Sequence, residues 1–413
     1  MHTFGILFLI FFALSLLIKW WLAQRHISHI RQHRSTVPAA FSEKISLDEH
    51  QKAADYTTAK VRFGRWPMLY DALLLLIWTF GGGLELLDQS WRGLGLEPIY
   101  TGIGVILSLM LLASLLDLPF SIYSTFVIEE RFGFNRTTAK TFLVDLIKGA
   151  VLALAIGTPL IWVILWLMEK AGEFWWLYAW LVWTGFSLFI AWAYPTWIAP
   201  IFNKFTPLED GETLQRITRL LQRCGFNSNG IFVIDGSRRS SHGNAYFSGF
   251  GKNKRIVFFD TLLKSLDNDE LEAVLAHELG HFKRKHIVKG MAITFLTSLV
   301  GLWVLAWLMQ HDWFYQALGV STSSTYMALL LFSLVVPVFT FLLSPLMSMF
   351  SRKNEFEADA FAAQQTDAHN LIRALVNLYR ENASTLTPDP LYSAFYDSHP
   401  PAPVRIAHLA NQN

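Results

Sequence analysis

Long apolar runs constrain the fold of this chain more than any other feature of its sequence. Each of seven runs is long enough to cross the roughly 30 Å hydrocarbon core of a bilayer. They cover residues 4–22, 69–87, 102–128, 149–168, 174–194, 290–310 and 326–350. With 53% hydrophobic and 16% charged residues, the chain is far from the composition of a soluble protein. We therefore predict a mainly α-helical, polytopic protein with about seven transmembrane helices.

Basic residues alternate between the loops and indicate an orientation. They gather after the first and third apolar runs, whereas the intervening loops contain little more than Arg92 and Lys170. The two clusters are Lys19, Arg25, Arg31, Arg34, Lys44, Lys52, Lys60, Arg62 and Arg65, and then Arg131, Arg136, Lys140 and Lys148. By the positive-inside rule these loops face the cytoplasm. The N-terminus is then outside, and residues 200–289 and the C-terminus are inside.

Other features limit the classes of function. A net charge of +2 argues against a nucleic-acid partner. The single cysteine, Cys224, excludes an internal disulfide and a cysteine-based zinc site. Carboxylates within or beside the apolar runs, such as Glu85 and Asp117, are either functional or paired inside the helical bundle.

The motif His277-Glu278-Leu279-Gly280-His281 carries the strongest chemical signal. On a helix, His277 and His281 lie one turn apart on the same face, where their imidazoles can bind one zinc ion. Glu278 can then act as general base toward a water activated by the metal. A capping box, Asp267 with Glu270, predicts where this helix begins, and no proline interrupts residues 262–284.

A zinc site that keeps an open position for water needs a third protein ligand. Glu355 and Asp359 follow the seventh apolar run at i and i+4, so they share one helical face. Glu355 could complete the zinc shell, while Asp359 could accept a hydrogen bond from a ligating histidine. The alternative is a charged helix next to the membrane.

These observations divide the chain into four parts. Residues 1–199 hold five transmembrane helices, and residues 200–289 form a cytoplasmic zinc protease domain. Residues 290–350 hold two further transmembrane helices, and residues 351–413 form a cytoplasmic part with the third zinc ligand.

Two strand-like runs precede the zinc motif. Residues 230–235 and 254–260 are rich in β-branched and aromatic residues, and Gly249, Gly251 and Asn253 between them indicate a turn. We predict a β-hairpin beside the zinc helix, whose free edge could hold an extended peptide by main-chain hydrogen bonds. His399, in a proline-flanked turn, is either a ligand of the substrate oxyanion or a structural residue.

The chain resembles the type I CaaX prenyl endopeptidases, a family of integral-membrane zinc metalloproteases. The matching stretches occur in the expected order over most of the sequence. They are residues 129–135, 200–208, 240–263, 277–281, 355–359 and 398–401, followed by Arg405.

This resemblance implies seven helices enclosing a water-filled chamber, with a small α+β gluzincin-type protease domain near the cytoplasmic side. It implies one zinc ion held by His277, His281 and Glu355, with Glu278 as general base. It also implies that Asn244 and His399 flank the substrate carbonyl, that Arg405 supports them, and that Asp359 supports the zinc ligands. The roles of His242 and His286 stay open.

The resemblance also suggests partners and a location. The substrates would be peptides or proteins, including peptides with a lipidated C-terminus, and the lipid bilayer would surround the helices. Without long insertions or an organelle-retention tail, the chain is expected to be a bacterial member in the inner membrane. A eukaryotic member would lie in the endoplasmic reticulum membrane.

Three other functions compete with this interpretation. A site-2-type intramembrane protease would carry its motif inside an apolar run, whereas Lys283, Arg284 and Lys285 follow the motif here. A transporter or channel with a structural zinc would not need a glutamate directly after the first ligand. A membrane zinc-binding scaffold or chaperone without proteolysis would not need the complete catalytic set.

Overall fold

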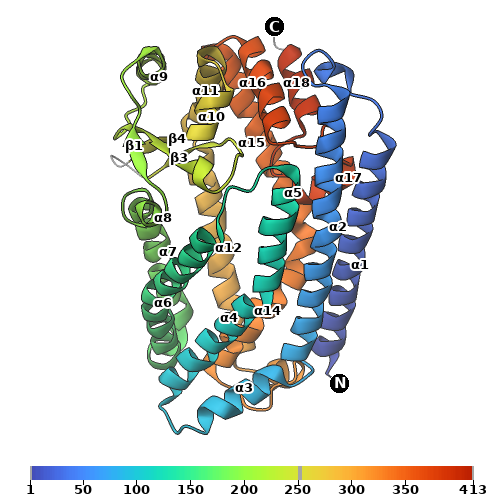
Figure 1. Cartoon of the computed structure of the whole chain (residues 1–413). Helices are drawn as coiled ribbons and strands as arrows, with labels where there is room; N and C mark the ends of the chain where they lie inside the picture. The colour runs from blue at the N-terminus through green and yellow to red at the C-terminus, as the bar shows by residue number, and fades with distance from the viewer. Residues whose placement is uncertain (1, 250–253, 412–413) are drawn as a thin grey trace.

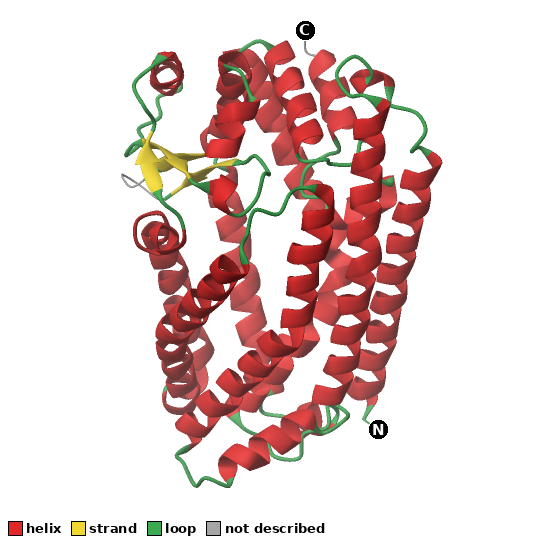
Figure 2. Cartoon of the chain, in the orientation of Figure 1, coloured by secondary structure: helices red, strands yellow, loops and turns green. Residues whose placement is uncertain are grey.

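The computed structural model describes residues 2–249 and 254–411, and in this part the chain is mainly helical (Figures 1 and 2). Within it, six helices or continuous helical segments are long and apolar enough to cross a membrane. They are Thr3–Gln32, Pro98–Phe132, Ala139–Lys170, Gly172–Phe202, His286–Leu308 and Thr325–Gln365. Many of their large apolar side chains, such as Ile10, Leu181 and Leu296, are exposed on the outer surface, as expected for lipid contact.

The second expected span is a bent pair of helices. Helix α2 (Leu47–Trp78) ends inside the predicted run of residues 69–87, and α3 (Gly83–Arg92) continues at an angle of 52°. Gly82 lies between them with φ of 77°, a left-handed conformation that glycine adopts without strain. The second expected span is therefore broken within residues 69–87, and the count of seven holds when the bent pair crosses as one span.

The remaining membrane-spanning segments contain several irregular turns. Two π-helical stretches, η2 and η4, interrupt them, and a 3₁₀ turn, η6, separates the two halves of the last. The elements are α1 (Thr3–Gln32), α4 (Pro98–Tyr123), η2 (Ser124–Glu129), α5 (Glu130–Phe132), α6 (Ala139–Lys170), α7 (Trp175–Ala193), η4 (Tyr194–Ile198), α8 (Ala199–Phe202), α12 (His286–Leu308), α14 (Thr325–Thr340), η6 (Phe341–Leu343) and α15 (Ser344–Gln365). Shorter turns are η1 (Ala39–Phe41), η3 (Gly172–Phe174) and α13 (Asp312–Gln316).

The described residues form a small four-stranded sheet in the order β1-β2-β4-β3. The strands are β1 (Phe205–Pro207), β2 (Ile231–Ile234), β3 (Ala245–Ser248) and β4 (Arg255–Phe259). The helices of this region are α9 (Glu212–Arg223), η5 (Gly236–Arg238), α10 (Asp260–Ser265) and α11 (Asn268–Lys283).

The sheet corrects the predicted hairpin. Both predicted strands exist, as β2 and β4, but they pair in parallel, and the antiparallel partner of β4 is β3. An apolar run indicates a strand but not the direction in which it pairs. The edge strand β3 is formed by the segment directly before Gly249. Of the turn residues, Gly249 has φ of 91°, whereas Gly251 and Asn253 lie outside the described residues.

The sheet and α11 lie at the same end of the molecule as the C-terminus, and the N-terminus lies at the other end (Figure 1). There α11 packs against α15, and α16 (Ala368–Glu381), α17 (Pro390–Tyr396) and α18 (Ala402–Ala410) complete the C-terminal part. A core of residues such as Ile217, Phe258, Leu275 and Leu371 joins these helices to the sheet.

Two hollows flank the sheet region. A cavity of about 1280 Å³ lies among α1, α2 and α14, and residues from the loop before β3 and from the C-terminal part close it. A groove of about 1320 Å³ lies between α7, β3, α11 and α12. The cavity agrees with the chamber that the family resemblance implies.

Candidate active site

Helix α11 presents the motif histidines. Its predicted capping box is confirmed, because Asp267 accepts a hydrogen bond from the Glu270 N–H and Glu270 accepts one from the Asp267 N–H. Leu271, Leu275 and Leu279 bury one face of the helix. This helix is not one of the candidate spans of the described residues, which argues against a site-2-type intramembrane protease.

Helix α15 presents the predicted carboxylates. It continues from the last membrane-spanning segment and carries Glu355 and Asp359, which are 3% and 0% exposed. Carboxylates this deeply buried need partners, since an unpaired charge in the interior is costly. The structure therefore does not support the alternative of a solvated helix next to the membrane.

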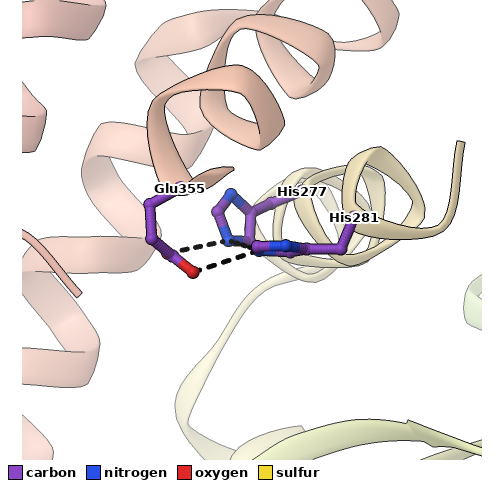
Figure 3. Close-up of side chains that lie close together, drawn as sticks. All are labelled: His277, His281 and Glu355. Atoms are coloured by element: carbon purple, nitrogen blue, oxygen red, sulfur yellow. Dashed lines mark hydrogen bonds and ion pairs between the residues drawn. The ribbon is translucent and has the colours of Figure 1, made fainter. Parts of the chain in front are cut away.

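His277, His281 and Glu355 converge on one point (Figure 3). The Nε2 atoms of the two histidines are 3.3 Å apart. Oε2 of Glu355 is 3.4 Å from Nε2 of His277, and Oε1 is 3.2 Å from Nε2 of His281. The two Nε2 atoms and the Glu355 carboxylate thus form a ligand triangle with contacts of 3.2–3.4 Å, in which each histidine faces a different carboxylate oxygen.

This triangle has the dimensions of a zinc site. Ligands bound to zinc at about 2.0–2.1 Å in tetrahedral geometry are about 3.3 Å from one another. Two histidines and one glutamate are also a donor set used by catalytic zinc sites, which keep the fourth position open. The residues present therefore fit one zinc ion.

The other ring nitrogen of His277 has a carboxylate partner. Nδ1 lies 2.8 Å from Oδ1 of Asp359, which places the ring proton on Nδ1 and leaves Nε2 free to bind metal. Burial and Arg405 would lower the pKa of His277, but its contacts with Asp359 and Glu355 outweigh them and raise it. Protons and metal therefore compete for this imidazole.

Arg405 holds Asp359 in place. Its guanidinium donates two hydrogen bonds to the Asp359 carboxylate, at 2.9 and 2.6 Å. Its Nη1 is 3.8 Å from Oε2 of Glu355. Arg405 thus contacts the proposed ligands and their partner, and its implied support of His399 and Asn244 stays a prediction.

Sequence reasoning left the role of His286 open, and the structure places it beside His281. The two Nδ1 atoms are 3.1 Å apart, and Nε2 of His286 is 3.1 Å from Oε2 of Glu357. Lys285, with φ of 58°, turns the chain between α11 and α12 and brings His286 back. A non-glycine residue in this left-handed region is uncommon, so no helical pattern predicts the contact.

The remaining predicted residues lie around the triangle. Nδ1 of His399 is 2.7 Å from Oε2 of Glu355, and its side chain is 64% exposed. Glu278 lines the groove together with His281. Asn244 lines the cavity on the other side, directly before β3. The structure thus brings together all the predicted residues except Asn244, which lines the cavity and not the groove beside Glu278.

Membrane-spanning helices, a ligand triangle and an adjacent carboxylate define a membrane zinc metalloprotease. Sequence comparison agrees: residues 26–204 match the family "CAAX prenyl protease N-terminal, five membrane helices", and residues 207–413 match peptidase family M48. The chain therefore belongs to peptidase family M48 and carries the N-terminal membrane domain of the CAAX prenyl proteases.

Individual relatives are similar over nearly their whole length. The CAAX prenyl protease 1 homolog of Arabidopsis thaliana is 36% identical, covering 92% of this chain and 91% of that protein. CAAX prenyl protease 1 of Saccharomyces cerevisiae is 35% identical, covering 90% and 88%. The crystal structure of S. mikatae Ste24p superposes with a TM-score of 0.91 at 31% identity, covering 99% of each chain. A transporter or a scaffold without proteolysis is not favoured.

Proposed function

We propose that His277, His281 and Glu355 hold one zinc ion and that Glu278 is the general base for peptide hydrolysis. The observation that carries this proposal is the ligand triangle of two Nε2 atoms and the Glu355 carboxylate, with contacts of 3.2–3.4 Å, beside a groove that Glu278 lines. When bound, zinc would supply a Lewis acid that polarises the peptide carbonyl and acidifies water.

Within this proposal each residue has one task. Glu278 accepts the proton of the attacking water and passes it to the leaving amine. His399 is exposed beside Glu355, where a ring N–H can donate to the oxygen of the scissile carbonyl. Asp359 and Arg405 are positioning residues, because they hold His277 and are themselves buried.

The edge strand β3 is the proposed seat of the peptide. It is the last strand of the sheet, so its outer edge is open to main-chain hydrogen bonds. Tyr246 and Phe247 line the groove with Glu278, while Asn244 lines the cavity. A peptide along β3 would therefore connect the two hollows past the zinc ligands, with Asn244 contacting its backbone.

The substrates proposed are proteins with a lipidated C-terminus. The relatives named above are CAAX prenyl proteases, and the groove beside Glu278 suits an apolar group. Its lining includes Trp183, Phe186 and Ile190 of α7 and Met291 of α12. An acyl or prenyl chain could enter it from the bilayer between these helices.

We propose the location and division of the chain on the same basis. The positive-inside rule supports a cytoplasmic catalytic end, and we propose the four parts with boundaries at residues 199, 289 and 350. The bacterial inner membrane remains a prediction from sequence.

The test is cleavage of a peptide panel by the detergent-purified full chain. Each peptide is assayed with and without a prenyl group on a cysteine near its C-terminus, and Glu278→Gln serves as the inactive control. We expect metal-dependent cleavage that is faster with the lipid. Equal rates would overturn the proposed substrate class, and no cleavage by zinc-containing protein would overturn the peptidase proposal.

A further inference from the structure

His242 and Gly243, which lead through Asn244 into the edge strand β3, are held from the C-terminal part of the chain. The Gly243 N–H donates to Oδ1 of Asn382 at 3.0 Å, and Nδ2 of Asn382 donates to the Gly243 carbonyl at 3.3 Å. Nδ1 of His242 lies 3.2 Å from the same Oδ1. The Asn382 side chain thus pairs with the Gly243 backbone as a neighbouring strand would. Gly243 directly precedes Asn244.

The other ring nitrogen of His242 contacts α2 and η2, which belong to the N-terminal part of the chain. Its Nε2 is 3.3 Å from the Tyr56 hydroxyl on α2 and 3.4 Å from Oε2 of Glu129 on η2. The Tyr56 hydroxyl donates to Oε1 of Glu129 at 2.6 Å. The Phe134 ring stacks on the imidazole at 4.3 Å between centroids. We name His242, Tyr56, Glu129 and Asn382 the β3 clamp.

The main chain ties the same segments together. The Ser241 N–H donates to the Phe134 carbonyl at 3.1 Å, and the Arg136 N–H donates to the Arg239 carbonyl at 3.0 Å. Asn135 and Ser240 form an antiparallel bridge. The chain that leads into β3 is therefore fixed to the loop between α5 and α6.

An apolar cluster includes Tyr56 of the clamp and packs beside its polar contacts. Ala53, Tyr56, Ile128, Phe134 and Ala383 are each at most 6% exposed and come from the membrane half and the C-terminal part. Removing a hydroxyl from Tyr56 would leave its ring in this cluster. The hydrogen bonds of the clamp therefore fix the orientation of its side chains more than they add buried apolar area. Hydrogen bonds depend on angle, whereas hydrophobic contact does not.

We propose that Tyr56, Glu129 and His242 are positioning residues that align the edge strand β3 with the zinc ligands for peptide binding. The inference rests on the proposed peptide seat along β3. Asn244, two residues after His242 of the clamp, lines the cavity with His242 and Tyr56, so a shift of the clamp displaces one end of the seat. The zinc ligands lie on α11 and α15, outside the clamp, and keep their geometry.

Two conservative variants test this, Tyr56→Phe and Glu129→Gln, alone and together. Each is measured as full-length protein by kcat/KM on a peptide long enough to cover β3, by the inhibition constant of a small hydroxamate that binds only zinc, and by zinc content. Tyr70→Phe is the matched control, since Tyr70 lies on the same helix and packs on Phe120.

We expect the long-peptide kcat/KM to fall about three- to tenfold for each single variant. Tyr56→Phe removes one hydrogen bond, and Glu129→Gln removes the charge that strengthens it. The double variant should lose little more, because the groups act as one unit. The inhibition constant of the hydroxamate and the zinc content should each stay within about twofold of the wild-type value.

Unchanged peptide kinetics would overturn the inference while the peptidase proposal stands. An equal loss of hydroxamate binding or zinc would also overturn it, since that pattern indicates a general structural role. A wild-type protein that cleaves no peptide overturns the proposed function and the inference with it.

Discussion

Gly280 of α11 lies directly against Ala358 of α15, and these two helices carry the proposed zinc ligands. A Cβ atom on Gly280 would come within 2.9 Å of the Ala358 Cα and 3.0 Å of its carbonyl oxygen. Backbone atoms cannot yield at such distances without moving the helix. The absence of a side chain at Gly280 thus sets how closely His277 and His281 approach Glu355.

Gly280→Ala should therefore weaken zinc binding and lower activity, because α11 and α15 must separate by some tenths of an ångström. Alanine favours a helix over glycine by about 1 kcal/mol, so helix propensity alone predicts the opposite change in stability. Zinc affinity by competition with a chelator is the measurement. Gly290→Ala is the control, since nothing lies within 4 Å of its added Cβ. A Gly280→Ala protein with wild-type zinc affinity would show that the helix spacing is not critical.

Glu355→Gln should cost more zinc affinity than any change outside the triangle. Mutation of an outer partner of a metal ligand typically costs about 10–100-fold in affinity, and loss of a ligand should exceed this range. Glu357→Gln, two residues along the same helix, should stay inside it, because Glu357 contacts only His286 of this group. Zinc titration of both variants decides the order, and equal affinities would refute the assignment of Glu355 as a ligand.

Arg405→Met should destabilise the protein by about 3–5 kcal/mol, because it leaves the Asp359 carboxylate buried without its bidentate partner. Arg405→Lys should restore only part of this, since a lysine cannot make both hydrogen bonds. Thermal unfolding in detergent measures the change. Arg405→Met combined with Asp359→Leu should be more stable than Arg405→Met alone, and a double variant that is less stable would contradict the account.

Asp389 should link stability to acid pH. Burial would raise the pKa of its carboxyl, but the Tyr392 backbone N–H and the Arg25 guanidinium outweigh burial and lower it. A lowered pKa contributes stability at pH values above the unfolded value of about 3.9, and this is lost as the pH falls below it. The unfolding midpoint of wild type should exceed that of Asp389→Asn at pH 7, and the gap should close toward pH 3. A gap that is constant with pH would exclude this linkage.

Much of the site could be predicted because its signals are local. The capping box, the motif on α11 and the i, i+4 pair of Glu355 and Asp359 each depend on a few residues within one helix. The contact between α11 and α15 could be predicted only because a catalytic zinc site needs a third protein ligand. Their close approach at Gly280 was not visible in any local pattern.

Features that depend on tertiary contacts escaped prediction. The parallel pairing of β2 with β4 is decided by the path of the chain between them, which apolar alternation does not report. The break in the second span depends on the left-handed turn at Gly82, and the contact of His286 with His281 on that at Lys285. Arg405 and Asp359 lie far apart in the chain, so their hydrogen bonds were not visible in any local pattern.

The most direct test is to measure zinc content and peptide cleavage together in Glu278→Gln. Glu278 lines the groove beside His281 and is not one of the three residues of the ligand triangle. The account predicts one zinc per chain, as in wild type, and a loss of kcat of about 10²–10⁴-fold, the range for a general base. A variant that keeps its zinc and cleaves peptides at the wild-type rate would contradict the proposed chemistry.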